Sequence, residues 1–303
     1  MQVDIVAGYL GAGKTTTIRH LIETDPEPQR LVVLVNEFGE LGIDGLLVAG
    51  AEDVVELSSG CICCTLRLDF RTQIKEIAER LHPRRLLIEP TGVATIGQVL
   101  KALDDPSIAP FIAGLRVFAL VDATSFNERL RESPRFFTSQ VQSADVIALN
   151  KIDLVEPARV EVLKAAVESL APDAWVVPTE RGRLPEEASL PPYHPPRDAP
   201  ESEVLSDLGS FSFRLSSQVP AETLRALFGR LRDGTLGKVE RAKALAETEE
   251  GWLRLDLAGS TFEEQPSGPV PEGRLVVIGR ELDSQGLREA VGQMTTSLTQ
   301  DRK

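Results

Sequence analysis

Short apolar runs alternate with amphipathic stretches through the first 180 residues of this 303-residue chain. The runs are almost entirely apolar, which is typical of parallel strands buried on both faces. We expect strands at Gln2–Ala7, Leu31–Asn36, Asp53–Leu57, Leu86–Glu89, Arg116–Val121, Val146–Asn150 and Ala174–Thr179. The intervening stretches repeat apolar residues every three or four positions, as helices with one buried face do. The alternation predicts an α/β domain over residues 1–180, with a mostly parallel sheet covered by helices on both faces.

The pattern changes after residue 180. Six prolines stand among acidic and small residues between positions 181 and 204, which predicts a stiff, extended linker. Beyond the linker, strands are expected at Gly209–Leu215, Trp252–Leu257 and Leu275–Ile278. Apolar residues at helical spacing add a helix that begins near Pro220. We therefore expect residues 205–303 to form a smaller α+β domain.

The composition indicates a soluble protein with an acidic surface. Hydrophobic residues make up 42% and charged residues 26% of the chain, and 33 Lys and Arg against 46 Asp and Glu give a net charge of -13. This charge argues against nucleic acid as a partner, because duplex binding depends on Lys and Arg that neutralise phosphates. No apolar run approaches the roughly 18 residues that a membrane span needs. A glycine-rich stretch stands where the apolar region of a signal peptide would lie, so we expect no membrane contact and a cytoplasmic location.

That glycine-rich stretch has the spacing of a phosphate-binding P-loop. Gly8 is followed, after four intervening residues, by Gly13, Lys14 and Thr15. Glycines let backbone N–H groups approach phosphate oxygens near a helix N-terminus. Lys14 is then placed to reach the β- and γ-phosphates of a nucleotide, and the Thr15 hydroxyl to bind magnesium.

Two later motifs extend this prediction to a complete nucleotide site. Glu89 ends an apolar strand, where a carboxylate can hold magnesium directly or through water, and Gly92 follows, where a backbone N–H could contact the γ-phosphate. Asn150, Lys151 and Asp153 belong to the tetrapeptide Asn-Lys-Ile-Asp after another strand. The Asp153 carboxylate can accept hydrogen bonds from N1–H and the exocyclic amine of guanine, a donor pair that adenine lacks. The sequence therefore predicts a guanine nucleotide.

All three cysteines of the chain lie within four positions, at Cys61, Cys63 and Cys64. Isolated cysteines are often buried as small hydrophobic residues, but this clustering indicates thiolate ligands for zinc, copper(I) or another borderline or soft metal. Local geometry limits how many of the three can converge on one ion, so a carboxylate, a water molecule or a residue of a partner would complete the coordination. The choice between zinc and cobalt stays open, because both accept similar ligands.

Taken together, the motifs resemble the CobW-like GTPases, which are relatives of the hydrogenase and urease nickel-insertion GTPases. The resemblance rests on GYLGAGKTTT, on NEFGELGID at 36–44, on SGCICC at 59–64, on LLIEPTG at 86–92 and on NKID at 150–153. It covers residues 2 to about 180 and continues more loosely into the C-terminal domain. The resemblance implies a P-loop GTPase that handles a transition metal.

The resemblance also implies roles for individual residues. Phosphate contacts are expected from Gly11, Ala12, Gly13, Lys14, Thr15 and Thr16, with Lys14, Thr15 and Glu89 supporting hydrolysis. Magnesium would be held by Thr15 and Glu89, and guanine would be read by Asn150, Lys151 and Asp153. Glu37 matches a glutamate that can join the metal site in this family, beside Cys63 and Cys64, and Cys61 is the further candidate ligand.

The leading hypothesis is a GTP-driven metallochaperone that delivers zinc or cobalt to a client metalloprotein. The segment Asn36–Asp44 would act as a switch that carries Glu37, so that hydrolysis alters the ligands around the metal. We expect slow turnover until a client or formation of a homodimer accelerates it. Two alternatives stay open, a regulatory GTPase with a structural zinc site and a P-loop kinase that phosphorylates a small molecule.

Overall fold

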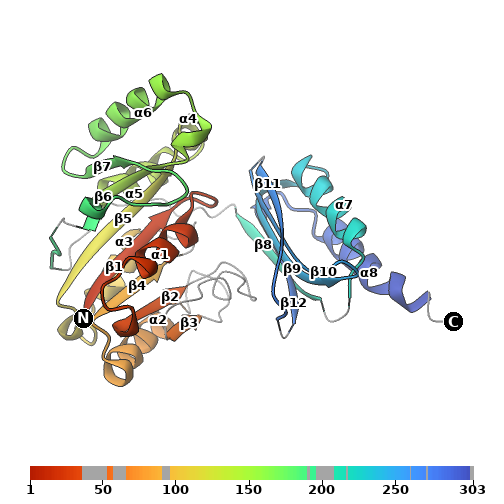
Figure 1. Cartoon of the computed structure of the whole chain (residues 1–303), viewed down its shortest axis with the longest axis horizontal. Helices are drawn as coiled ribbons and strands as arrows, with labels where there is room; N and C mark the ends of the chain where they lie inside the picture. Colours follow the sequence, from red (N-terminus) through yellow and green to blue (C-terminus); the bar gives the residue numbers. More distant parts are fainter. Residues whose placement is uncertain are drawn as a thin grey trace. The chain divides into compact units, whose positions relative to one another are not determined.

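The computed structural model describes residues 1–35, 53–56, 66–90, 96–189, 192–195, 208–215, 218–259, 261–270 and 272–300. It divides into two compact units, each built on its own sheet (Figure 1). The described residues up to 195 belong to the first unit, and those from 208 onward belong to the second. Among these residues, no helix combines the length and apolar character needed to cross a membrane.

The first unit contains a parallel sheet with the strand order β3-β2-β4-β1-β5-β6-β7. The strands are β1 Gln2–Gly8, β2 Leu31–Val35, β3 Asp53–Glu56, β4 Arg85–Glu89, β5 Gly114–Asp122, β6 Val146–Asn150 and β7 Trp175–Pro178. All seven are expected from the sequence, and their described ends lie within two residues of the expected ones. Since the strands are parallel, all their carboxyl ends meet at one edge of the sheet, where ligands of such folds bind.

Helices cover both faces of this sheet, as the sequence predicts. The α-helices of the first unit are α1 Lys14–Glu23, α2 Leu66–Glu76, α3 Ile96–Leu103, α4 Phe126–Glu132, α5 Pro134–Gln142 and α6 Pro157–Leu170. Shorter helical turns are η1 Pro28–Arg30, η3 Ile77–Leu81, η4 Ala109–Phe111, η5 Ile152–Leu154 and η6 Glu186–Ser189. Helices α2 to α6 contribute to the hydrophobic core on one face. Helix α1 packs on the other face through Ile18, Leu21 and Ile22.

The second unit is an antiparallel sheet with helices α7 Ala221–Arg232 and α8 Ser284–Gln300 against one face (Figure 1). Its strands run in the order β11-β10-β9-β12-β8. They are β8 Gly209–Leu215, β9 Lys238–Thr248, β10 Gly251–Ala258, β11 Thr261–Pro266 and β12 Gly273–Arg280. The expected strands correspond to β8, β10 and β12, and the expected helix to α7, which begins directly after Pro220.

Strand β9 is not expected from the sequence, because it is rich in Ala, Lys, Glu and Leu, which favour helices. Ala242, Ala244 and Ala246 alternate along it and are fully buried in the core of the second unit. Their small side chains let α7 approach the middle of the sheet. Packing on a helix therefore overrides the local preference of this segment.

The proline-rich segment differs from the extended linker that its composition predicts. Its described residues, 181–189 and 192–195, lie on the first unit. Leu184 is buried in the core that α1 covers. His194 exchanges backbone hydrogen bonds of 2.7 and 2.8 Å with Leu115, near the start of β5. Proline fixes an extended backbone, and such a backbone can lie along a strand as well as span a gap; residues 196–204 fall outside the described residues.

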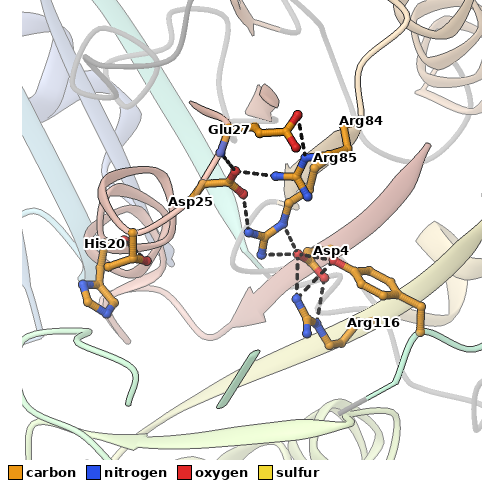
Figure 2. A network of polar contacts seen from close by, with 9 residues as sticks. Asp4, His20, Asp25, Glu27, Arg84, Arg85 and Arg116 are labelled. Atoms are coloured by element: carbon orange, nitrogen blue, oxygen red, sulfur yellow. Dashed lines mark hydrogen bonds and ion pairs between the residues drawn. The ribbon is translucent and has the colours of Figure 1, made fainter. Parts of the chain in front are cut away.

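A buried polar network ties this segment to the amino-terminal halves of the central strands (Figure 2). Asp4 on β1 is fully buried, and its carboxylate accepts hydrogen bonds from Arg85 Nε at 2.6 Å and from Arg116 Nε at 2.9 Å. The Tyr193 hydroxyl donates to Asp4 at 3.2 Å and accepts from Arg116 Nη2 at 3.1 Å. Arg85 also donates from Nη1 to Asp25 at 2.7 Å. Removing Asp4 would leave two guanidinium groups without this carboxylate, a loss that costs about 3–5 kcal/mol for buried ion pairs.

Burial, reinforced by the neighbouring Asp4 carboxylate, raises the pKa of Tyr193 from its ordinary 10.0 to about 12. The folded protein thus holds the phenolic proton more tightly than the unfolded chain. The stability that this group contributes is complete below about pH 10 and is lost as the pH rises through about 12. We expect the free energy of unfolding in urea to fall between these pH values, and to fall less steeply for Tyr193→Phe. An equal slope in the native protein and in Tyr193→Phe would contradict the assignment.

Candidate functional site

The P-loop connects β1 to α1 at the carboxyl edge of the parallel sheet. Gly11 and Gly13 have φ angles of +80° and +104°, which glycine adopts without strain. The Ala12 N–H donates to the Tyr9 carbonyl at 3.1 Å and closes the turn. Gly13 is the residue before α1, so the N–H groups of the first helical turn, starting at Lys14, have no partners within the helix. The loop therefore has the backbone form that binds phosphate.

Two side chains with oxygen ligands meet beside the loop. The Thr15 hydroxyl lies 3.2 Å from each carboxylate oxygen of Glu89. Glu89 ends β4, the neighbour of β1, and is 4% exposed. Lys14 Nζ lies over the loop, 3.4 Å from the Tyr9 carbonyl oxygen. Hydroxyl and carboxylate oxygens are the ligand types that magnesium prefers, so this pair suits the ion that accompanies a nucleotide.

Asn150 joins the P-loop to the loop that follows β7. Its Nδ2 donates to the Ala12 carbonyl at 2.8 Å. Its Oδ1 accepts from the Gly182 N–H at 3.0 Å and from the Thr179 hydroxyl at 3.3 Å. Asn150 is 2% exposed, and both the nitrogen and the oxygen of its side-chain amide form hydrogen bonds with protein atoms. Asn150 thereby holds the P-loop and the loop after β7 in one arrangement.

The other two residues of the guanine motif differ in their surroundings. Lys151 has a left-handed backbone with φ of +63°, and its Nζ lies 2.7 Å from Asp122 Oδ2. Asp153 stands in the short helical turn η5, and its side chain is exposed to solvent. An accessible carboxylate is what acceptance of two hydrogen bonds from a guanine base requires.

Three residues of this arrangement are missing from the sequence-based prediction. Asp122 ends an apolar strand at the same edge as Glu89, and that shared position is the signal that could have found it. Thr179 and Gly182 follow the last parallel strand, and no motif marks them. Gly182 has φ of +69°, and a Cβ there would lie 2.7 Å from the Thr17 hydroxyl on α1. Its close approach to α1 therefore requires glycine.

The predicted transition-metal ligands Glu37, Cys61, Cys63 and Cys64 lie outside the described residues, as does Gly92. Within the described ranges, no group of three or more His, Cys, Asp or Glu side chains could hold a metal ion. The cysteine site therefore stays a prediction from the sequence.

A family model for the nucleotide-binding domain of CobW, HypB and UreG matches residues 2–178, more than half of the chain. The chain belongs to the CobW/HypB/UreG family. A second model, for the C-terminal domain of the cobalamin synthesis protein cobW, matches residues 208–295. The family resemblance inferred from the motifs is thus confirmed, and the protein is a P-loop GTPase of the CobW type.

Relatives of this CobW-family protein cover nearly its whole length. It is 28% identical to the zinc chaperone YeiR of Escherichia coli (strain K12), over 98% of this chain and 99% of the relative. It is 30% identical to the zinc chaperone CobW of Pseudomonas aeruginosa, over 98% of this chain and 92% of the relative. Among solved structures, the Zn(II)-bound YjiA GTPase from E. coli aligns with a TM-score of 0.46 and 20% identity, over 97% of this chain and 98% of that one.

Replacing Gly13 by alanine is expected to lower the affinity for GTP tenfold or more. The new Cβ would stand 2.5 Å from Asn150 Nδ2, at a φ of +104° that alanine rarely adopts. The P-loop and the Asn150 amide would have to move apart, and a loss of about 1.4 kcal/mol in binding already corresponds to tenfold. Titration with a fluorescent GTP analogue measures the change.

Gly251 provides a matched control for this substitution. It has the same φ of +104°, but a Cβ there meets no heavy atom of the described structure within 4 Å. Gly251→Ala therefore introduces the backbone strain without the collision, in the second unit, and should retain native GTP affinity. Equal affinities for native protein and Gly13→Ala would show that the contact between the P-loop and Asn150 does not matter for binding.

Proposed function

We propose that this protein is a GTP-driven metallochaperone that binds zinc at the cysteine cluster and delivers it to a client metalloprotein. Membership of the family supports the GTPase part of the proposal. The names of the two relatives aligned over nearly the whole chain, both zinc chaperones, favour zinc over cobalt as the metal. The proposal includes a cytoplasmic protein whose slow GTP hydrolysis is accelerated by the client or by formation of a homodimer.

The observation that carries the proposal is the register of three neighbouring strands. Val35 on β2 pairs with Glu89 on β4 on one side and with Glu56 on β3 on the other. Glu37 stands two positions after Val35, and Cys61 stands five positions after Glu56. Successive Cα atoms are about 3.8 Å apart, so both segments that carry predicted metal ligands start within a few residues of the magnesium-binding edge. This supports coupling between the nucleotide and the transition metal.

The described residues supply the nucleotide half of this mechanism. We assign the phosphates to the P-loop N–H groups and Lys14, and the base to Asp153. When bound, magnesium would neutralise charge on the phosphates, and Thr15 and Glu89 are the residues that would hold it. The Thr15 hydroxyl and the Glu89 carboxylate already lie together, so little reorganisation is needed before the nucleotide enters.

Coupling requires that the two nucleotide states bind the metal with different affinity. Val35, the last residue of β2, pairs with Glu89, and the segment Asn36–Asp44, which carries Glu37, follows Val35 in the sequence. Loss of the γ-phosphate can therefore change the position of one metal ligand. By linkage, zinc must then change the preference between GTP and GDP by the same factor. Release of zinc to a client after hydrolysis follows if the GDP state binds zinc more weakly.

We expect zinc affinity to differ about tenfold or more between the GTP-analogue and GDP states, which is within the usual range of coupling between sites. Competition with a chromophoric chelator under reducing conditions measures the affinity in the presence of the GTP analogue, GDP and no nucleotide. Cys63→Ala should lose tight zinc binding in all three. Lys14→Ala, which weakens phosphate binding, should keep zinc binding but lose its dependence on nucleotide. Tight binding that is equal in all three states would instead indicate a regulatory GTPase with a structural zinc site.

A further inference from the structure

We propose that Asp122 is the positioning residue for Lys151 and thereby sets the affinity of the base site for guanine nucleotides. The inference rests on the proposed assignment of the guanine base to the Asn-Lys-Ile-Asp motif. Asp122 ends β5 and pairs in register with Asn150, the last residue of β6. The carboxylate is thus one strand away from the motif, and its Oδ2 lies 2.7 Å from Lys151 Nζ.

The Asp122 carboxylate is itself fixed in place. Its Oδ1 accepts hydrogen bonds from the Thr124 N–H at 2.8 Å and the Thr124 hydroxyl at 2.6 Å. The Ala123 N–H donates to the Asn150 carbonyl at 2.9 Å and holds this turn against the end of β6. One carboxylate oxygen therefore belongs to the turn, and the other faces the lysine.

The ion pair is sheltered from water. The side chains of Lys151 and Asp122 are 23% and 14% exposed, respectively. Charges that are partly removed from water attract more strongly than exposed pairs, which contribute little. An attraction of this kind can hold a long, flexible side chain in one conformation.

Lys151 needs such support because its backbone is strained. Its φ of +63° is in the left-handed region, which non-glycine residues adopt at a cost. Asn150, the residue before Lys151, is held by hydrogen bonds to Ala12 and Gly182, and Asp122 holds the ammonium group of Lys151. With its backbone and its ammonium group both held, the four-carbon stem of Lys151 is constrained two positions before the exposed Asp153.

A stem constrained in this way offers a pre-arranged apolar surface to a flat purine. Without Asp122 the lysine would sample several conformers, and nucleotide binding would have to order it. The free energy needed to order the lysine would weaken binding of the base and leave the phosphate chemistry unchanged. Loss of Asp122 should therefore raise Kd and KM for guanine nucleotides and leave kcat at saturating GTP nearly as it was.

Asp105 offers a matched control within the same unit. Its Oδ1 accepts from the Ser107 N–H at 3.0 Å and the Ser107 hydroxyl at 2.6 Å, and its Oδ2 pairs with Arg71 at 2.5 Å. Asp105 thus has the same kind of turn and the same kind of ion pair as Asp122. It stands in the connection between α3 and β5, away from the carboxyl end of β5.

The experiment compares native protein, Asp122→Asn, Lys151→Met, the double variant and Asp105→Asn. Asparagine keeps an acceptor for Thr124 and removes the charge that faces Lys151. We expect Asp122→Asn to raise Kd for GDP and KM for GTP about tenfold, with kcat changed less than twofold. In the Lys151→Met background the same substitution should change Kd less than twofold, because Asp122 acts through the lysine. Asp105→Asn should bind GDP like the native protein.

Several results would overturn the proposal. Native Kd in Asp122→Asn, an equal further loss in the Lys151→Met background, or the same loss in Asp105→Asn would leave Asp122 as a turn residue only. If Asp122→Asn does not fold, Asp122→Glu tests the same point, since it keeps the charge and displaces it by one methylene; native affinity there would contradict a positioning role. Failure of the native protein to bind GTP would remove the proposed function as well, whereas native binding that ignores Asp122 removes this inference alone.

Discussion

The hydrogen bond from the Asn150 amide to the Ala12 carbonyl connects the phosphate half of the nucleotide site to the base half. Ala12 belongs to the loop after β1, and Asn150 ends β6, with β5 between them in the sheet. The oxygen of the same amide accepts hydrogen bonds from the loop after β7. Three connections that are remote in sequence thereby act as one body. Because the amide is buried, breaking any of these bonds would leave a polar group without water to replace its partner.

The sequence was sufficient for the features that depend on local pattern. Buried parallel strands appear as continuous apolar runs, and the glycine spacing of the P-loop is imposed by backbone angles at Gly11 and Gly13. The roles of Asp122 and Gly182 depend on which strands are neighbours, and one sequence does not show that order. Strand β9 was missed for a related reason, since its alanines suit a strand only where a helix packs over them. The cysteine ligands could be proposed from residue type alone, because three clustered thiols have few other uses, whereas Glu37 was proposed from the family resemblance.

The two ends of the parallel sheet differ in the polar side chains that they bring together. At the carboxyl edge, the Thr15 hydroxyl lies beside the Glu89 carboxylate, and Lys14 lies over the P-loop. At the amino-terminal half, Asp4 is enclosed with Arg85 and Arg116, and Arg85 also bonds Asp25 (Figure 2). The Tyr193 hydroxyl donates to Asp4 in the same network. Buried ion pairs of this kind contribute little net stability against an apolar alternative, but they specify which groups must pack together. Here they specify that the proline-rich segment returns to β1 and β5.

The loop after β7 lies against α1 at two places, since Gly182 approaches Thr17 and the Leu184 carbonyl lies 2.8 Å from His20 Nε2. Together with the hydrogen bond to Asn150, these contacts fix the position of the loop at three points. An insertion between Thr179 and Leu184 would displace at least one of these contacts. Among natural variants of this protein, the length of this loop should therefore be conserved.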